Sequence, residues 1–305
     1  MKTIVTGSAG YLGSVLVPFL REAGHRVVPF DSARYGLHCD FNVVMRDTAD
    51  PFTWETLGSP DTDVVINLAA LVGEPLCKKY PEESYRTNVS GTRLAAEWCN
   101  EHGAKLIQAS TCSNYGVSEG LATEESPLKP LGVYASTKVA SEEEAKKADE
   151  YTIFRFGTLY GPSPRMRWDT MINEWVYNCL YDGSLNIYNG SAYRPFLHVI
   201  DACRAINIAL EKPTETRSQT FNVAGINITK AQLAGAIVGV VGGGWKLGGG
   251  EDKRDYRVDS SKFESAAGFS CIHTLASLSS DLDEIRLFAL VRKTNNAKDF
   301  VMPHD

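Results

Sequence analysis

The feature that most constrains the fold of this chain is a glycine triplet close to its N-terminus. Residues 2–6 form a short apolar run that predicts a buried strand, and Gly7, Gly10 and Gly13 follow with two residues between successive glycines. An apolar-periodic segment then predicts a helix to about Ala23. A strand, a glycine turn and a helix in this order allow free N–H groups at the helix N-terminus to approach a pyrophosphate. The chain therefore predicts a dinucleotide site at the start of a parallel α/β sheet.

The second predicted strand, residues 25–31, ends in a carboxylate, Asp31. An acid at this place accepts a hydrogen bond from a free ribose 2′-hydroxyl and repels a 2′-phosphate, which favours NAD over NADP. Arg34 lies close by and leaves NADP open as an alternative. A turn cap is the simpler structural role for Asp31.

The end of a third strand predicts a further part of the same site. Residues 63–70 are almost continuously apolar, as expected for a parallel sheet that is covered on both faces. Ala69 and Ala70 at its carboxyl end are small enough for a cofactor to lie against the backbone, and ligands of open α/β sheets bind at that end. Asp47 and Thr48 either border an adenine pocket or belong to a helix N-cap ahead of Pro51.

A tyrosine and a lysine four residues apart predict the chemistry. Tyr134 and Lys138 share one face of a predicted helix, and a nearby ammonium favours the phenolate, so Lys138 is expected to lower the pKa of Tyr134. A surface helix without function is the alternative. Residues 105–109 predict a strand, and Thr111 follows it at the same sheet edge. Thr111 either hydrogen-bonds an oxygen that Tyr134 deprotonates or caps a turn.

The composition excludes several other classes of protein. A formal net charge of -6 and a pI of about 5.6 argue against nucleic acid or an anionic membrane as a partner. Seven cysteines without a CxxC pair fit a reducing compartment, and neither a disulfide framework nor a metal site is expected. No signal peptide or membrane-spanning apolar run is present in the sequence, so a cytoplasmic protein is expected.

In their order and spacing, these motifs resemble those of the extended short-chain dehydrogenase/reductases, in particular the NAD-dependent nucleotide-sugar epimerases and dehydratases. The resemblance runs from Met1 to about Ala267. It implies that Tyr134 is the catalytic base and acid, that Lys138 also holds the nicotinamide ribose, and that Thr111 positions the sugar oxygen. The cofactor-binding residues expected from the motifs and the resemblance together are Gly7, Gly10, Tyr11, Leu12, Gly13, Asp31, Asp47, Thr48, Leu68, Ala69, Ala70, Asn88, Tyr134 and Lys138.

Two positions depart from the pattern of one branch of that family. In nucleotide-sugar 4,6-dehydratases an Asp-Glu pair follows the catalytic threonine, whereas this chain has Cys112 and Ser113 there. Neither is a carboxylic acid. The GDP-fucose synthases and GDP-mannose 3,5-epimerases carry a cysteine two residues after the catalytic hydroxyl; Ser113 stands at that place here, so Cys112 is one position out of register. Epimerisation at C4 needs the least extra machinery and is the expected reaction. A 4-ketoreductase, a dehydratase, or a non-catalytic NAD-binding regulator or scaffold are the alternatives.

The substrate is expected to be a nucleotide sugar, bound by residues of the second half of the chain. Arg165 and Arg167 lie on a proline-rich loop that either clamps a diphosphate or is solvated. The resemblance implies that Arg194 contacts the nucleotide diphosphate, that His198 and Asp201 are structural, and that Thr158 stands where many relatives have asparagine. The expected substrate-binding residues are Cys112, Ser113, Thr158, Arg165, Arg167, Asn173 and Arg194.

These observations predict a doubly wound parallel sheet, or Rossmann fold, with a smaller C-terminal α+β substrate-binding domain. The NAD-binding domain is expected at residues 1–155, with strands returning to it at about 194–207 and 221–224. The substrate-binding domain is expected at 157–192 and 225–270, with a helix and tail at 271–305. Glycines at 242–250 predict a flexible segment. By analogy with the family, helices at 81–102 and 134–149 are expected to form a homodimer.

Overall fold

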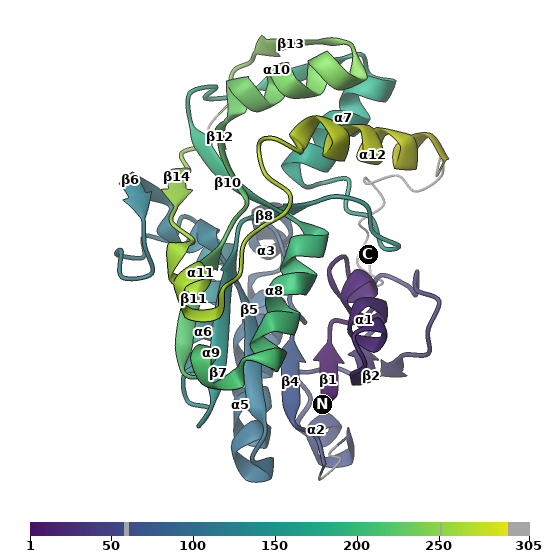
Figure 1. The fold of residues 1–305 in the computed structure, drawn as a ribbon, viewed down its shortest axis with the longest axis vertical. Coiled ribbons are helices and arrows are strands. Elements are labelled where there is room, and N and C mark those ends of the chain that lie inside the picture. The colour runs from purple at the N-terminus through teal and green to yellow at the C-terminus, as the bar shows by residue number, and fades with distance from the viewer. Residues whose placement is uncertain (58–60, 251, 292–305) are drawn as a thin grey trace.

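The computed structural model describes residues 1–57, 61–250 and 252–291. Its centre is a seven-stranded sheet of order β11-β7-β5-β4-β1-β2-β3, in which every neighbouring pair is parallel (Figure 1). The order runs outward from β1 in both directions, which is the doubly wound arrangement expected from the sequence. The strands are β1 (Lys2–Thr6), β2 (Arg26–Asp31), β3 (Val44–Met45), β4 (Val64–Asn67), β5 (Lys105–Thr111), β7 (Tyr151–Phe156) and β11 (Gln219–Val223).

Alternate residues of the central strands divide the core into two layers. Val5, Ile66, Ile107 and Phe154 belong to the core that contains the apolar faces of α1 (Gly13–Glu22) and α8 (Val199–Glu211). These side chains are fully buried, and each contributes about 1.5–3 kcal/mol through burial of apolar surface. The two helices lie side by side on one face of the sheet in Figure 1.

In each of these four strands, the residue that precedes the one just named points to the opposite face of the sheet. Ile4, Val65, Leu106 and Ile153 form a second core with Trp54 and with residues of the helices on that side. The helices are α2 (Pro51–Leu57), α5 (Gly91–His102) and α6 (Val133–Ala145). Because both faces are covered, these strands are apolar throughout, as the sequence predicted.

The remaining elements form a smaller lobe above the carboxyl ends of the strands (Figure 1). Three strands pair as β12-β10-β8, and two further pairs are β13-β9 and β14-β6. Helices α7, α10 and α12 pack on one another in this lobe. The bounds are β6 (Val117–Ala122), β8 (Thr158–Tyr160), α7 (Met171–Tyr181), β9 (Ser184–Ile187), β10 (Tyr193–His198), β12 (Ile226–Thr229), α10 (Lys230–Val241), β13 (Gly244–Leu247), β14 (Asp255–Val258) and α12 (Leu278–Val291).

Short helical segments connect the larger elements. The helix expected at 81–102 consists of α4 (Pro81–Tyr85), a π-helical turn η1 (Arg86–Ser90) and α5. The extra residue of a π turn changes which side chains face the sheet, and such turns are frequent at functional sites. The other short helices are α3 (Glu74–Lys79), η2 (Cys112–Tyr115), α9 (Pro213–Thr216) and α11 (Ser261–Ala267).

Two expectations about the second half need correction, and one lies beyond the structure. The strand from Arg194 does not return to the main sheet, because β10 pairs with β8 on one side and β12 on the other, whereas α8 packs beside α1 and β11 pairs with β7 of that sheet. The glycine-rich segment 242–250 contains an ordered strand, β13, which pairs with β9. The tail expected to fray at 294–305 lies outside the described residues.

Two observations bear on the environment of the chain. All seven cysteines are free thiols. In the part of the chain that the structure describes, no helix has the length and apolar character needed to cross a bilayer.

Candidate active site

The glycine triplet forms the turn between β1 and α1 and is packed against the end of β4. Gly7 has a φ of +66°, and a Cβ on it would lie 2.7 Å from the backbone nitrogen of Ala69. A Cβ on Gly13 would collide with the carbonyl oxygen of Gly7. The loop therefore has no room for side chains at these two positions, and the backbone is left open to close approach by a pyrophosphate.

The carboxylate of Asp31 is held at the end of β2 by two backbone donors. Its Oδ2 accepts from the Ala9 N–H at 3.0 Å and its Oδ1 from the Ala33 N–H at 2.8 Å. Burial raises the pKa of Asp31, and these hydrogen bonds act in the opposite direction. Arg34, the residue that left NADP open, forms an ion pair with Glu83 at 2.5 Å. The positions of these groups fit a free ribose hydroxyl better than a phosphate.

Asp47 and Thr48 lie in the connection between β3 and α2. Asp47 Oδ1 accepts from the Ala49 N–H at 2.9 Å, and its Oδ2 accepts from Arg86 at 2.6 Å. Thr48 is buried against α2 and α5. The N-cap expected in this segment is made by Asp50, whose carboxylate accepts from the Phe52 N–H at 3.1 Å.

The end of β4 is fixed by hydroxyl and amide side chains. Thr6 Oγ1 accepts from the N–H groups of Leu68 and Ala69, each at 3.2 Å. Asn88, on the π turn, accepts from the Leu71 N–H at 2.7 Å and donates to Thr137 of α6 at 2.9 Å. Asn88 is fully buried and connects the loop after β4 to α6. The cofactor contact expected for Asn88 stays a prediction.

Thr111, Tyr134 and Lys138 come together at the carboxyl end of β5. Thr111 caps η2, since its Oγ1 accepts from the Ser113 N–H at 3.1 Å. Its hydroxyl also lies near enough to the phenol of Tyr134 to act on the pKa of that group in the lowering direction. Lys138 is only 4% exposed and donates to the carbonyl of Ala109, one of the last residues of β5, at 2.6 Å. The turn-cap and catalytic roles expected for Thr111 are therefore compatible in one geometry.

The direction of the tyrosine shift differs from the sequence-based expectation. Burial raises the pKa of Tyr134 well above its ordinary value, and the charge of Arg167 and the Thr111 hydroxyl oppose this only in part. Burial also lowers the pKa of Lys138 to about 8, although the charge of Glu142 acts upward. The expected lowering by Lys138 is wrong for this structure because desolvation of the phenol dominates and the ammonium is held by the Ala109 carbonyl.

Cys112 and Ser113 have different environments although they are adjacent. The side chain of Cys112 is 1% exposed, and its thiol donates to the carbonyl of Arg155 at 3.0 Å. Burial raises the pKa of this thiol far above its ordinary value. Cys112 therefore lies beneath the site and does not contact a substrate, which corrects its inclusion among the substrate-binding candidates. Ser113 is partly buried, and its Oγ lies 3.1 Å from the hydroxyl of Tyr256.

The loop with two arginines lies along the cofactor groove. The guanidinium of Arg165 lies over the ring of Tyr35 at 5.6 Å and its charge lowers the pKa of Asp31 in part. Arg167 pairs with Asp169 through two hydrogen bonds of 3.0 and 2.6 Å, and its charge acts on Tyr134. Both arginines are partly buried and their charges act on Asp31 and Tyr134, so the loop is not fully solvated, and a clamp on a diphosphate stays a prediction.

Tyr11 and Asn173 attach this loop to the glycine turn. Tyr11 donates from its hydroxyl to the carbonyl of Gly161 at 2.5 Å, and Ser163 donates to the carbonyl of Tyr11 at 2.7 Å. Asn173 is fully buried and donates to the Tyr11 hydroxyl at 3.1 Å. It therefore positions the loop, and its expected contact with a substrate stays a prediction. Thr158 begins β8, where it pairs with Phe196 of β10.

Arg194 belongs to a separate cluster of cations around one carboxylate. Asp252 forms ion pairs with Arg194, with Lys230 at 3.0 Å and with Arg254 at 2.9 Å. Although burial acts upward, Arg254 and Arg194 hold the pKa of Asp252 well below its usual range. Arg194 is 2% exposed, and its Nη1 atom finds no hydrogen-bond partner among the described residues. Three cations around one carboxylate leave a net positive charge that suits an anionic ligand.

Several residues of the site were not found from the sequence. Glu74 accepts from the N–H groups of Val133 and Tyr134 at 2.8 and 3.0 Å and so caps the catalytic helix. Lys230, Asp252 and Tyr256 were also missed. Their partners lie far away along the chain, and no local spacing indicates the pairing. A local signal existed for Glu142, which stands one turn after Lys138 on the same helix face.

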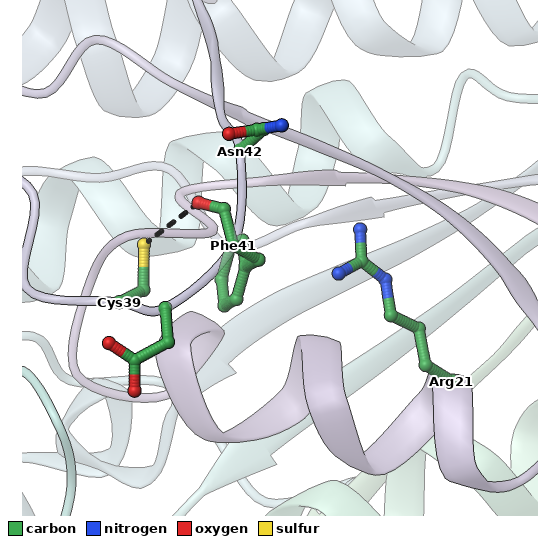
Figure 2. Close-up of a pocket in the computed structure, with 5 residues that line it drawn as sticks. Arg21, Cys39, Phe41 and Asn42 are labelled. Carbon is green, nitrogen blue, oxygen red and sulfur yellow. Dashed lines mark hydrogen bonds between the residues drawn. The ribbon is translucent and has the colours of Figure 1, made fainter.

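A depression elsewhere on the surface is unrelated to this site. It lies beside Arg21, near the C-terminal end of α1 (Figure 2). Its volume is about 440 Å³. Arg21 extends toward the ring of Phe41, at 5.4 Å, and the Cys39 thiol donates to the Phe41 carbonyl. None of the predicted site residues lines this depression.

Comparisons with known proteins agree with the geometry. A UDP-glucose 4-epimerase of Halalkalibacterium halodurans is 29% identical over 253 residues, covering 73% of this chain and 75% of the relative. A dTDP-glucose 4,6-dehydratase of Streptomyces niveus is 26% identical over 301 residues, covering 88% of each chain. Among solved structures, MoeE5 in complex with UDP-glucose and NAD is 26% identical with a TM-score of 0.83, covering 95% of this chain and 100% of that one.

The match to a family model covers most of the chain. The model of the NAD dependent epimerase/dehydratase family matches residues 3–224, which include the glycine turn, Asp31, Thr111, Tyr134 and Lys138. The glycine cradle and the backbone-held carboxylate of Asp31 fit the cofactor in that description. The chain belongs to the NAD dependent epimerase/dehydratase family.

Proposed function

We propose that this protein is an NAD-dependent nucleotide-sugar epimerase that inverts a sugar at C4. Two groups of polar residues support this. The hydroxyls of Thr111 and Tyr134 lie at the end of β5, and the cations of the Arg194 cluster lie in the smaller lobe. Tyr256 lies between them, since its ring contacts Arg194 and its hydroxyl lies 3.1 Å from Ser113 Oγ, two residues after Thr111. The arrangement suits a ligand with a reacting alcohol at one end and a diphosphate at the other.

The Arg194 cluster, made of Arg194, Lys230, Arg254 and Asp252, has the properties of a diphosphate site. A guanidinium presents several donors in a fixed plane, and Asp252 uses only part of those on Arg194. A buried N–H without a partner costs about 1–3 kcal/mol. A phosphate oxygen on Arg194 Nη1 removes that cost and balances the net positive charge. The same ligand would extend from this cluster toward Ser113 and Thr111.

The catalytic residues then have distinct tasks. The glycine turn and Asp31 would hold NAD, which would supply reversible hydride transfer at the sugar carbon. Tyr134 exchanges a proton with the sugar hydroxyl, while Thr111 orients the oxygen by hydrogen bonding. Because burial raises the pKa of the Tyr134 phenol in this structure, positive charge brought close on binding must favour its ionised form before it accepts that proton. Lys138, with a pKa of about 8, is largely protonated at neutral pH and supplies positive charge beside Ala109. Inversion requires only that the keto-sugar presents its other face before re-reduction.

The observation that carries the choice of reaction is the pair of residues after Thr111. Elimination of water needs an acid and a base next to the sugar, in addition to the tyrosine. Cys112 is buried with its thiol on a carbonyl, and Ser113 is a neutral hydroxyl near Tyr256. Neither supplies the proton transfers of a dehydratase, whereas C4 inversion needs none beyond those of Tyr134.

The test is product analysis in heavy water with a panel of UDP-, GDP-, CDP- and dTDP-hexoses, beginning with UDP-glucose. A C4 epimerase returns the original hydride, so the product retains its C4 hydrogen and carries no deuterium. The reaction should proceed with the NAD that co-purifies with the protein and without added reductant. Proton NMR identifies the sugar, and absorbance at the NADH band follows the cofactor.

Other outcomes reject the proposal. Deuterium at C5 with a deoxy-keto product identifies a dehydratase, and stoichiometric consumption of NADPH identifies a reductase. Tyr134→Phe separates catalysis from binding. Tyr151→Phe is the matched control, because Tyr151 begins β7 and so lies at the amino ends of the strands, away from the carboxyl ends where the site lies. Equal turnover of the two variants would remove Tyr134 from the mechanism and leave a binding protein as the better description.

A further inference from the structure

Tyr256 is a buried aromatic residue between the cation cluster and the catalytic residues. It lies on β14 and is 2% exposed. The guanidinium of Arg194 lies over its ring, 5.3 Å from the centroid, and its hydroxyl lies 3.1 Å from Ser113 Oγ. The side chain of Tyr256 therefore contacts both Arg194, which is proposed to bind the diphosphate, and Ser113, which is expected to bind the sugar.

Ser113 connects this phenol to the catalytic hydroxyl. The Ser113 N–H donates to Thr111 Oγ1 at 3.1 Å, so the backbone of Ser113 and the side chain of Thr111 are held in one turn. The phenol of Tyr256 also acts electrostatically on that of Tyr134. A series of contacts thus runs from Arg194 through Tyr256 and Ser113 to Thr111.

The packing around Tyr256 makes this connection rigid. Its ring belongs to a small core with Cys112, Tyr115, Ala122 and Val258. Because the ring cannot turn without disturbing this core, its hydroxyl has a fixed position. The hydrogen bond therefore restricts the Ser113 side chain to one orientation.

We propose that Tyr256 is a positioning residue that fixes the Ser113 hydroxyl toward the sugar and connects its orientation to the Arg194 diphosphate site. This inference rests on the proposed nucleotide-sugar function and names the residues that orient the sugar. The rigid ring of Tyr256 holds Arg194 and the Ser113 hydroxyl at a fixed separation, so a diphosphate bound by Arg194 places a hexose hydroxyl against Ser113 and beside Thr111. Interaction energy far from the reacting carbon is in this way used for orientation.

The experiment compares Tyr256→Phe, Ser113→Ala and the double variant in a double-mutant cycle. Each single variant should lower kcat/KM about three- to tenfold, the effect of one neutral hydrogen bond. The kcat/KM of the double variant should be no lower than that of the less active single variant, since both substitutions remove the same interaction. Ser113→Thr keeps a hydroxyl and should stay within about threefold of the parent protein.

A binding measurement separates positioning from general damage. The probe is whichever of UDP, GDP, CDP or dTDP binds the parent protein in calorimetry. Tyr256→Phe should leave its affinity within about twofold, because the probe lacks the sugar and the ring contact with Arg194 is retained. Tyr193→Phe is the matched control, since Tyr193 lies under Arg257 at 4.8 Å on the neighbouring strand and should leave kcat/KM unchanged.

Three results would overturn the inference. They are unchanged kcat/KM in Tyr256→Phe, additive losses in the cycle, or an equal loss of probe affinity and kcat/KM. Failure of the proposed function is distinguishable, because then no nucleotide sugar is converted by the parent protein and Tyr134→Phe behaves like the parent.

Discussion

Glu142 forms a buried ion pair beneath the catalytic helix. Its carboxylate accepts from Arg155 at 3.0 and 2.7 Å, from Asn114 at 2.8 Å and from Ser110 at 2.5 Å. Glu142 is fully buried and Arg155 is 4% exposed. The change Glu142→Gln keeps the size of the side chain but leaves the guanidinium of Arg155 without its counter-charge.

The loss of stability can be given a magnitude. Removing one partner of a buried ion pair costs about 3–5 kcal/mol, because the remaining charge stays desolvated. For a protein of this size, about 2–4 °C of Tm corresponds to 1 kcal/mol, so the expected decrease is roughly 6–20 °C. The same change removes the upward influence of Glu142 on the pKa of Lys138, so that pKa should fall below about 8.

Urea unfolding followed by circular dichroism and by tryptophan fluorescence measures the free energy of unfolding. The matched control is Glu143→Gln, the next residue, whose carboxylate is 63% exposed and pairs with Lys146. Its effect should stay within about 0.5 kcal/mol, as for other exposed pairs. The double variant Glu142→Gln with Arg155→Met should recover part of the loss, since the uncompensated charge is removed as well.

Two results would refute the reasoning. A folded Glu142→Gln protein that loses less than about 1 kcal/mol would show that the buried charge of Arg155 is compensated in another way. A double variant less stable than Glu142→Gln would show that packing and not charge sets the cost. Glu143→Gln must remain near the parent for either comparison to count.

Three further predictions follow from other parts of the structure. Tyr134→Phe should lower turnover by about 10²- to 10⁴-fold while the protein still retains NAD, as shown by cofactor released on denaturation. Gly13→Ala should purify without NAD, because its Cβ collides with the carbonyl of Gly7; retained NAD would contradict this. Burial lowers the pKa of His198 to about 4, so unfolding free energy should be lost as the pH falls from about 6.5, by about 2 kcal/mol at pH 5. His198→Asn, which retains an N-cap acceptor for α8, should remove this contribution; an unchanged slope between pH 7 and pH 5 would contradict it.

The pH prediction follows from the protonation states of folded and unfolded chains. The folded protein holds His198 neutral, while the unfolded chain binds a proton below about pH 6.5. Protons therefore favour unfolding between these two pKa values, and stability rises with pH across that window. Measurements at pH 7 and pH 5 compare one condition outside the window with one inside it.

Features set by neighbouring residues could be predicted from the sequence. The glycine spacing predicted the turn between β1 and α1, and the four-residue interval placed Tyr134 and Lys138 on one helix. The apolar runs predicted central strands covered on both faces, and the parallel sheet confirms the fold class. The resemblance predicted the NAD dependent epimerase/dehydratase family, which the family match confirms. The individual substrate-binding roles stay predictions.

Features that join distant segments could not be predicted. The direction of the Tyr134 pKa shift depends on burial among residues from distant parts of the chain, such as Cys77, Arg167 and Tyr256, and no motif encodes that burial. The sequence also placed β10 in the main sheet, because a strand pattern gives no information about which strand it will pair with.

The sequence by itself determined the local devices of this protein: the glycine turn, the carboxylate at the end of β2, and the tyrosine and lysine on one helix. Backbone periodicity fixes such relations within a few residues. Only the tertiary structure decided that Arg194 meets Asp252 and that Tyr256 meets Ser113, pairs separated by 58 and 143 residues. Those contacts depend on the order of the strands and on the crossovers between them, and the spacing of residues along the chain does not specify either.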